Sequence, residues 1–172
     1  NGGAPRQNAM VTLTDDHAML PEVPGGETYD PTGKVETRKM TTLYDTFQRG
    51  VRLNGDAPCL GTRQETGMYS WITYKEMDEL VQSFGAGLSS LGGMESGEYL
   101  GIMSRNRVEW VVSMVAAHHY NFVIVPLYDT LGEEALTHIV NQTELKIIVC
   151  APALKDTLGK LADKCPSLEK IV

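Results

Sequence analysis

The stretch VIVPLYDTLGEEA, residues 123–135, decides the expected fold class of this 172-residue chain. It begins with an apolar run typical of a buried strand and passes through a proline into a polar, acidic turn. We expect a strand over residues 122–125, ended by Pro126 and Leu127, and a helix that begins at Glu133. A strand followed at once by a helix is half of a βαβ unit.

The same alternation continues on both sides of this stretch. Expected strands cover residues 99–103, 122–125, 145–150 and 168–172, and expected helices cover residues 108–119, 133–141 and 153–164. The strands are nearly all apolar and are joined through helices, so they should pair in parallel with right-handed crossovers. The sequence therefore predicts an α/β fold with a doubly wound, mainly parallel sheet and flanking helices.

Two further segments precede this sheet. Residues 1–40 are rich in Gly, Pro, Thr and Asp without periodicity, which predicts an irregular lead-in to a domain over residues 41–172. A helix from near Thr42 should place Leu43, Phe47 and Val51 on one stripe. Short β-prone runs at residues 59–63 and 69–72 predict a β-hairpin.

Several acidic residues have a structural explanation as parts of helix caps. Thr73 is followed three residues later by Glu76, and a long helical pattern then runs to Leu91. The expected caps are formed by Thr73 with Glu76, Asn106 with Glu109, and Thr130 with Glu133. In each pair a polar side chain and a carboxylate would satisfy the unpaired amides of a helix N-terminus.

The loop Tyr128, Asp129 and Thr130 is the candidate contact site. In an open α/β sheet, ligands collect in the loops at the carboxyl ends of the strands. We therefore expect this loop to contact a substrate or another domain, with a structural role first.

Composition excludes several classes of protein. A formal net charge of −7 argues against nucleic-acid binding, which usually needs a clustered basic face. The three cysteines are widely spaced without a CxxC pair, which argues against a disulfide framework or a zinc clip. The oiliest region, residues 110–128, is interrupted by His118, His119 and Asn121, so we expect a buried core, with Trp110 against the sheet, and no transmembrane segment.

The usual nucleotide and catalytic motifs are missing. Gly85 and Gly87 begin a GxGxxG pattern, but Ser90 stands at its last position and the glycines lie late in a helical stripe. Small residues in that setting are typical of close packing. No P-loop, GxSxG elbow or HExxH helix is present. We therefore assign no catalytic, cofactor-binding or metal-binding residue.

Three stretches resemble a known family. YSWITYKEMDE (residues 69–79), GIMSRNRVEW (101–110) and VPLYDTLGEEALTHIVNQTE (125–144) are similar, in this order, to the N-terminal part of long-chain fatty acyl-CoA synthetases. These enzymes are members of the adenylate-forming (AMP-binding) superfamily. The resemblance covers roughly residues 27–172 and implies that the chain is part of a larger adenylate-forming enzyme fold.

The resemblance implies a parent enzyme that converts ATP and a fatty acid to an acyl-adenylate and then transfers the acyl group to coenzyme A, with magnesium assisting. The family's phosphate loop and catalytic lysine would lie beyond Val172, so this piece should bind no cofactor and show no activity alone. Its partners would be the remaining domains of the parent, with the fatty acid as the parent's substrate. The expected location is the cytoplasm or the periphery of an intracellular membrane.

One alternative is a self-contained, non-catalytic small-ligand-binding or regulatory module. The apolar run at residues 168–172 favours a domain truncated at its C-terminal end, since the next strand and its covering helix would be absent. Exposed apolar surface and an open sheet edge would then favour self-association of the isolated chain.

Overall fold

The computed structural model describes residues 28–29, 35–36, 40–92 and 94–172, and the chain divides into residues 1–39 and 40–172. In the first unit, β1 (Thr28–Tyr29) pairs antiparallel with β2 (Val35–Glu36). This short pair lies within the segment that was predicted to be irregular. The rest of that predicted lead-in falls outside the described residues.

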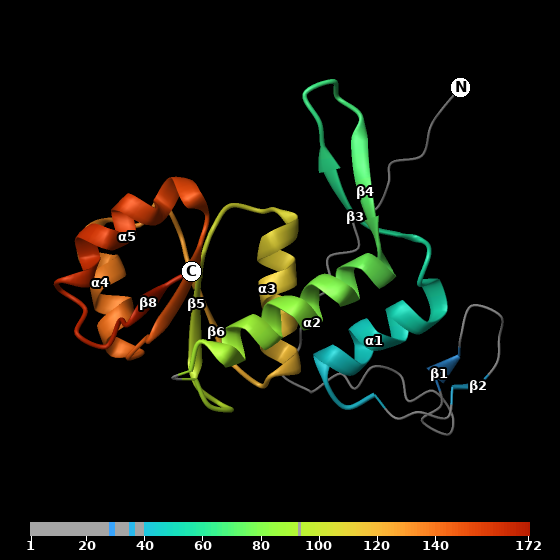
Figure 1. Cartoon of the computed structure of the whole chain (residues 1–172), viewed down its shortest axis with the longest axis horizontal. Helices are drawn as coiled ribbons and strands as arrows, with labels where there is room; N and C mark the ends of the chain where they lie inside the picture. The colour runs from blue at the N-terminus through green and yellow to red at the C-terminus, as the bar shows by residue number, and fades with distance from the viewer. Residues whose placement is uncertain (1–27, 30–34, 37–39, 93) are drawn as a thin grey trace, which may run out of the picture. The chain divides into compact units, whose positions relative to one another are not determined.

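A four-stranded parallel sheet forms the centre of the second unit (Figure 1). Its strands are β5 (Tyr99–Met103), β6 (Val123–Leu127), β7 (Ile147–Cys150) and β8 (Lys170–Ile171). They lie in the order β6-β5-β7-β8, so β5 has a neighbour on each side. The predicted doubly wound, parallel α/β sheet is confirmed.

Helices cover both faces of this sheet (Figure 1). One face carries α2 (Tyr74–Ser90) and α3 (Val108–His119); the other carries α4 (Glu133–Gln142) and α5 (Lys155–Ala162), which a short 3-10 turn (Pro152–Leu154) precedes. Apolar side chains fill the space between α4, α5 and the sheet; the fully buried ones include Met103, Leu136, Val140, Leu145, Ile148, Leu158 and Leu161. The other face has its own cluster of Leu88, Leu100, Ala117, Phe122 and Ile147.

Pro126 does not end its strand, contrary to the sequence-based prediction. It lies inside β6, in register with Ile102 of β5. Because β6 is at the edge of the sheet, no further strand needs the N–H that proline lacks. The strand therefore continues to Leu127.

A second layer lies beyond α2 and α3. It contains α1 (Leu43–Asn54) and the predicted hairpin, formed by β3 (Pro58–Arg63) and β4 (Tyr69–Thr73). Partly buried side chains of this layer, among them Phe47, Leu60 and Ile72, pack on a buried cluster of α2 and α3: Met77, Val81, Val112, Val115 and Ala116. Leu43, predicted on the buried stripe of α1, is instead 69% exposed, because it is the first residue of the helix and precedes the turns that pack.

The N-terminus of α2 carries a complete capping box. The Thr73 side chain accepts from the Glu76 N–H, and Glu76 Oε2 accepts from the Thr73 N–H at 2.7 Å. The backbone hydrogen bond from Thr73 is the main cause that lowers the pKa of the Glu76 carboxyl. The local pattern of Thr73 and Glu76 is therefore realised, while the amides of Tyr74 and Lys75 donate to the carbonyls of Ala57 and Gly55.

Of the two glycines in α2, only Gly85 serves packing. A Cβ at Gly85 would lie 2.3 Å from Cε2 of Tyr120, whereas a Cβ at Gly87 would meet no atom within 4 Å. Gly85 is buried and Gly87 is exposed. The glycine at position 85 thus lets the Tyr120 ring lie directly on the helix backbone, as the interpretation of close packing predicted.

We expect Gly85→Ala to destabilise the protein by about 1–3 kcal/mol, because the added methyl overpacks the Tyr120 contact. Gly87→Ala is the matched control on the same helix and should instead stabilise it by roughly 0.5–1 kcal/mol through backbone entropy. Urea denaturation of both variants measures the difference. Equal effects of the two substitutions would contradict the packing role of Gly85.

The capping box also predicts a pH dependence. Because the pKa of Glu76 is lowered in the folded state, its contribution is present above the ordinary carboxyl value of 4.5 and is lost as the pH falls through the depressed pKa. Glu76→Gln keeps an acceptor without the charge, so its stability deficit relative to the wild type should shrink on acidification. Denaturation between pH 7 and pH 3 tests this, with Glu79→Gln on the same helix as the surface-charge control. A deficit independent of pH would show that the ionised form has no special role.

Candidate functional site

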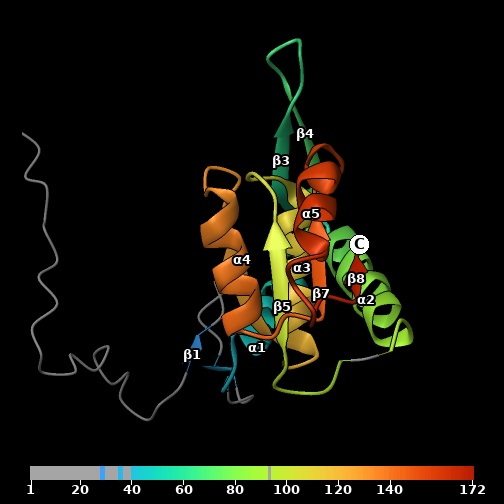
Figure 2. The same cartoon turned by 90° about the vertical axis from the view of Figure 1, so that its left-hand side faces the viewer.

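The connections of the sheet diverge at β5. The chain leaves β5 through α3 to β6 on one side, and it returns through α4 to β7 on the other side. The carboxyl ends of β5 and β7 are therefore the topological switch point, where open α/β sheets bind ligands. Figure 2 shows that the carboxyl end of β5 points toward the same end of the unit as the β3–β4 hairpin.

A hollow of about 230 Å³ lies at this switch point. Its lining combines the ends of β5 and β7 with the first turns of α3: Ile102, Ser104, Arg107, Glu109, Trp110, Ser113, Val149, Cys150, Ala151 and Pro152. We call it the switch-point hollow. Most of its wall is apolar, with two hydroxyls and one ion pair, a composition that suits binding of a small group.

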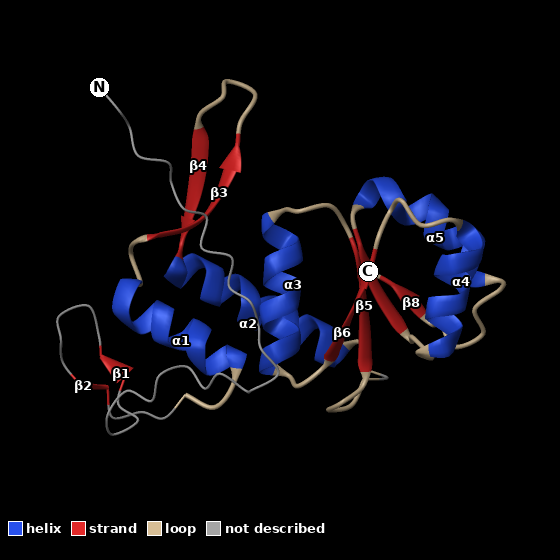
Figure 3. Cartoon of the chain, turned by 180° about the vertical axis from the view of Figure 1, so that it is seen from behind, coloured by secondary structure: helices blue, strands red, loops and turns tan. Residues whose placement is uncertain are grey.

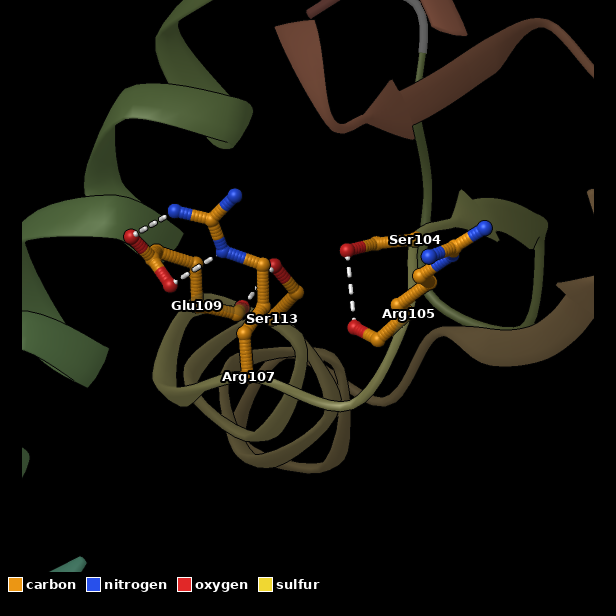
Figure 4. A network of polar contacts seen from close by, with 5 residues as sticks. All are labelled: Ser104, Arg105, Arg107, Glu109 and Ser113. Atoms are coloured by element: carbon orange, nitrogen blue, oxygen red, sulfur yellow. Dashed lines mark hydrogen bonds and ion pairs between the residues drawn. The ribbon is translucent and has the colours of Figure 1, made fainter. Parts of the chain in front are cut away.

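The ion pair of the hollow joins Arg107 and Glu109 (Figure 4). The guanidinium donates from Nε to Oε2 and from Nη2 to Oε1, each at 2.6 Å, in a bidentate arrangement. This hydrogen bonding lowers the pKa of the Glu109 carboxyl and raises the pKa of Arg107. Both groups therefore stay charged, and neither is poised to exchange a proton near neutral pH.

The predicted cap at Asn106 is wrong. Arg107 is the N-cap of α3, and no side chain of the cap residue bonds the helix amides. The helix thus begins one residue later than the Asn106 pattern requires, and Glu109 turns its carboxylate to Arg107 instead. The Glu109 carboxylate thus accepts hydrogen bonds from the charged guanidinium of Arg107 rather than from the backbone N–H of Asn106.

The hydroxyls and the thiol of the hollow are not activated. Ser113, only 2% exposed, donates to the Glu109 carbonyl at 2.7 Å, and Ser104 donates to the Arg105 carbonyl at 2.9 Å (Figure 4). Burial raises the pKa of the Cys150 thiol, so it stays protonated. The described groups can hold a ligand here, but they do not form a nucleophile with its base.

A second, wider hollow of about 650 Å³ lies between the β5–α3 loop and the β6–α4 loop. It is lined by Ser104, Arg105, Asn106, Trp110, Pro126, Leu127, Tyr128 and Asp129. Trp110 lines both hollows and is half-buried, so the expectation that it packs fully against the sheet is wrong. Its place in the first turn of α3 puts the indole at the carboxyl edge of the sheet rather than over the strands.

Two residues of the predicted contact loop reach this second hollow. Asp129 accepts from Nε of Arg105 at 3.0 Å, which ties the two loops together. Tyr128 is 64% exposed beside it. Thr130 lies in neither lining.

The predicted cap of Thr130 with Glu133 is also wrong. Gly132 is the N-cap of α4, and no side-chain cap bond forms. Glu133 instead pairs with Lys164 after α5, and this hydrogen bond lowers the pKa of Glu133. The turn Tyr128–Leu131, closed by the Leu131 N–H on the Tyr128 carbonyl, holds Thr130 away from the helix end.

Sequence reasoning missed Arg105, Arg107 and the segment 149–152 as parts of the site. A signal was available for the last of these, because a crossover on each side of β5 implies that β7 ends beside it. Within residues 40–92 and 94–172 and the two short strands, no three His, Cys, Asp or Glu side chains converge as metal ligands. The described helices also include none long and apolar enough to span a membrane.

The similarity to known proteins covers the part of the chain that forms the sheet and its flanking helices. The family model described as AMP-binding enzyme matches residues 47–172. Long-chain-fatty-acid–CoA ligase 1 of Cavia porcellus is 44% identical over 108 residues, 62% of this chain and 16% of the relative. Long-chain-fatty-acid–CoA ligase 5 of Rattus norvegicus is 39% identical over 135 residues, 76% of this chain and 20% of the relative. The chain thus spans a fifth or less of these relatives.

Solved structures share the fold at lower identity. The anthranilate CoA ligase AuaEII in complex with anthranoyl-AMP superposes with a TM-score of 0.69 at 18% identity, over 76% of this chain and 24% of the other. A putative long-chain-fatty-acid CoA ligase from Rhodopseudomonas palustris CGA009 gives a TM-score of 0.67 at 17% identity, over 76% and 32%. At this identity the likeness supports the fold alone.

The cap geometry distinguishes two threonines that look alike in sequence. Thr73→Ala should cost about 1 kcal/mol, because it removes the acceptor for a helix amide. Thr130→Ala should change stability by less than about 0.5 kcal/mol, because Thr130 caps no helix. Thermal or urea denaturation of the two variants provides the comparison. A Thr130→Ala loss as large as that of Thr73→Ala would restore the cap expected from sequence.

Proposed function

Because the chain belongs to the AMP-binding enzyme family, we propose that it is an N-terminal segment of a long-chain fatty acyl-CoA synthetase. The observation that most strongly supports this proposal is the 39% identity to a long-chain-fatty-acid–CoA ligase over 76% of the chain. The parent would join a fatty acid to AMP with ATP and then pass the acyl group to coenzyme A. This segment would supply scaffold and a domain interface, in the cytoplasm or at a membrane surface.

The described residues do not fit a magnesium or triphosphate site. No three carboxylates or histidines among them converge, and the bidentate Glu109 pair occupies the Arg107 guanidinium at the N-terminus of α3. We therefore derive no step through ATP, magnesium or coenzyme A on this segment. Those groups would be held elsewhere in the parent.

The part that this segment contributes is a rigid edge at the carboxyl ends of its strands. The Arg105–Asp129 pair joins the two loops that line the wider hollow, and Trp110 stands between the two hollows. Arg105 is 88% exposed, so this pair by itself contributes little to stability. Its role in the parent would be to position the loop of Tyr128 and Asp129 for contact with substrate or with a further domain.

The test is pyrophosphate exchange into ATP with palmitate and magnesium, measured on this chain and on the longer enzyme that contains it. We expect exchange by the longer enzyme and none by the 172-residue chain, since activated nucleophiles and phosphate-binding motifs are absent from its described residues. Sustained exchange by the chain alone would contradict the scaffold role. A longer enzyme that activates no fatty acid would contradict the proposed parent.

A further inference from the structure

The β3–β4 hairpin has two different faces. The antiparallel register pairs Gly61 with Trp71 and Arg63 with Tyr69, so these four residues share one face. The opposite face carries Thr62 and Ser70 toward the tip and, nearer the helices, Leu60 and Ile72, which pack on the buried cluster of α2 and α3. Toward the tip, Gln64 Nε2 donates to Ser70 Oγ at 2.7 Å and to the Thr62 carbonyl at 3.2 Å, as on a solvated surface.

The aromatic face is held flat although it is exposed. A Cβ at Gly61 would lie 3.0 Å from three atoms of the Trp71 ring, so the indole lies directly on the β3 backbone. The Tyr69 and Trp71 rings are 5.9 Å apart at 30°, and the two residues are 54% and 56% exposed. Met68 beside them is 72% exposed. These contacts preorganise an exposed aromatic surface.

This hairpin projects from the helices of its unit (Figures 1 and 3). Every residue from Gly61 to Trp71 is exposed, so nothing that the structure describes in residues 40–172 covers the aromatic face. The helices meet the opposite face, through Leu60 and Ile72, so the aromatic face is the one left open. An exposed, ordered aromatic surface of this kind marks a site of interaction with a partner outside the described residues.

We propose that the aromatic face, Gly61, Arg63, Tyr69 and Trp71, is the docking surface for a further part of the same enzyme. The proposal rests on the proposed function, because it needs the longer parent. The length of the relatives supports this occupant: the chain spans only 16% and 20% of the two ligases, and 24% of the AuaEII structure.

Charge defines the chemistry of the docking segment. Arg63 forms no ion pair with the described residues, and covering this face would remove its guanidinium from water. A desolvated guanidinium needs acceptors, and a carboxylate matches both its charge and its forked donors, so we expect the docking segment to carry an acidic side chain beside its apolar ones. A neighbouring hollow of about 680 Å³ is lined by residues 60–63, 105–109 and 111. Of its arginines, Arg105 pairs with Asp129 and Arg107 pairs with Glu109, which leaves the charge of Arg63 unmatched among the described residues. The docked segment would thus reach the carboxyl edge of the sheet.

Cysteine labelling tests the docking surface directly. Tyr69→Cys and, as a control, Thr157→Cys on the exposed surface of α5 are placed separately in the 172-residue chain and in the longer enzyme. Maleimide labelling is compared with wild-type background, after circular dichroism shows that each variant is folded. We expect the labelling rate of residue 69 to be lower by about tenfold or more in the longer enzyme, because the docked segment must open before the thiol can react. The labelling rate of residue 157 should be the same in both proteins.

Equal labelling of residue 69 in both proteins would overturn the proposal. If residue 69 is protected in the 172-residue chain and the protection disappears on dilution, the face binds a second copy of the chain. If the protection requires phosphatidylserine vesicles, the face binds a lipid surface. Either result also overturns the proposal. A charge reversal tests the acidic side chain expected in the docking segment. Arg63→Glu should restore fast labelling of residue 69 in the longer enzyme, whereas the control Lys75→Glu should not. If Arg63→Glu has no effect, the docking segment carries no acidic partner for Arg63. Pyrophosphate exchange on the same longer protein reports the proposed function separately, so protection without exchange would reject only that function.

Discussion

The burial of β5 between two parallel neighbours is the constraint on which the rest of this domain depends. Leu100, Ile102 and Met103 are at most 1% exposed, and each such side chain contributes about 1.5–3 kcal/mol relative to exposure. Between them, Gly101 allows Ile148 of β7 to approach within 2.8 Å of where a Cβ would stand. Apolar residues on both faces let helices cover both sides of β5, and the glycine permits the close approach of Ile148.

Because β5 is central, the crossovers leave it in opposite directions, and this divergence creates the switch-point hollow. The same topology brings Val149–Pro152, far along the sequence, beside the first turn of α3. Ion pairs then tie the residues at this edge of the sheet: Arg107 binds Glu109 in the switch-point hollow, and Arg105 binds Asp129 in the wider one. The arrangement shapes a surface at the carboxyl edge of the sheet, which is what the proposed scaffold role requires.

The acidic residues show how context decides the role of a side chain. Glu76, Glu109 and Glu133 all stand in the first turn of a helix, where a carboxylate is favoured by the helix dipole. Only Glu76 completes a capping box. The other two bind Arg107 and Lys164, since a charge-assisted hydrogen bond is stronger than one to a neutral amide.

The sequence by itself determined the elements and their class. The apolar runs placed β5 and α3 at their observed bounds, and the TYKE pattern placed the capping box of α2, because burial periodicity and capping act over a few residues. Tertiary structure decided the rest. Pro126 is tolerated because β6 is an edge strand, Trp110 lines two hollows because α3 starts at the end of the sheet, and Glu133 pairs with Lys164 because α4 and α5 pack on one face. Each of these outcomes depends on a neighbour distant in sequence, which no local pattern of residues encodes.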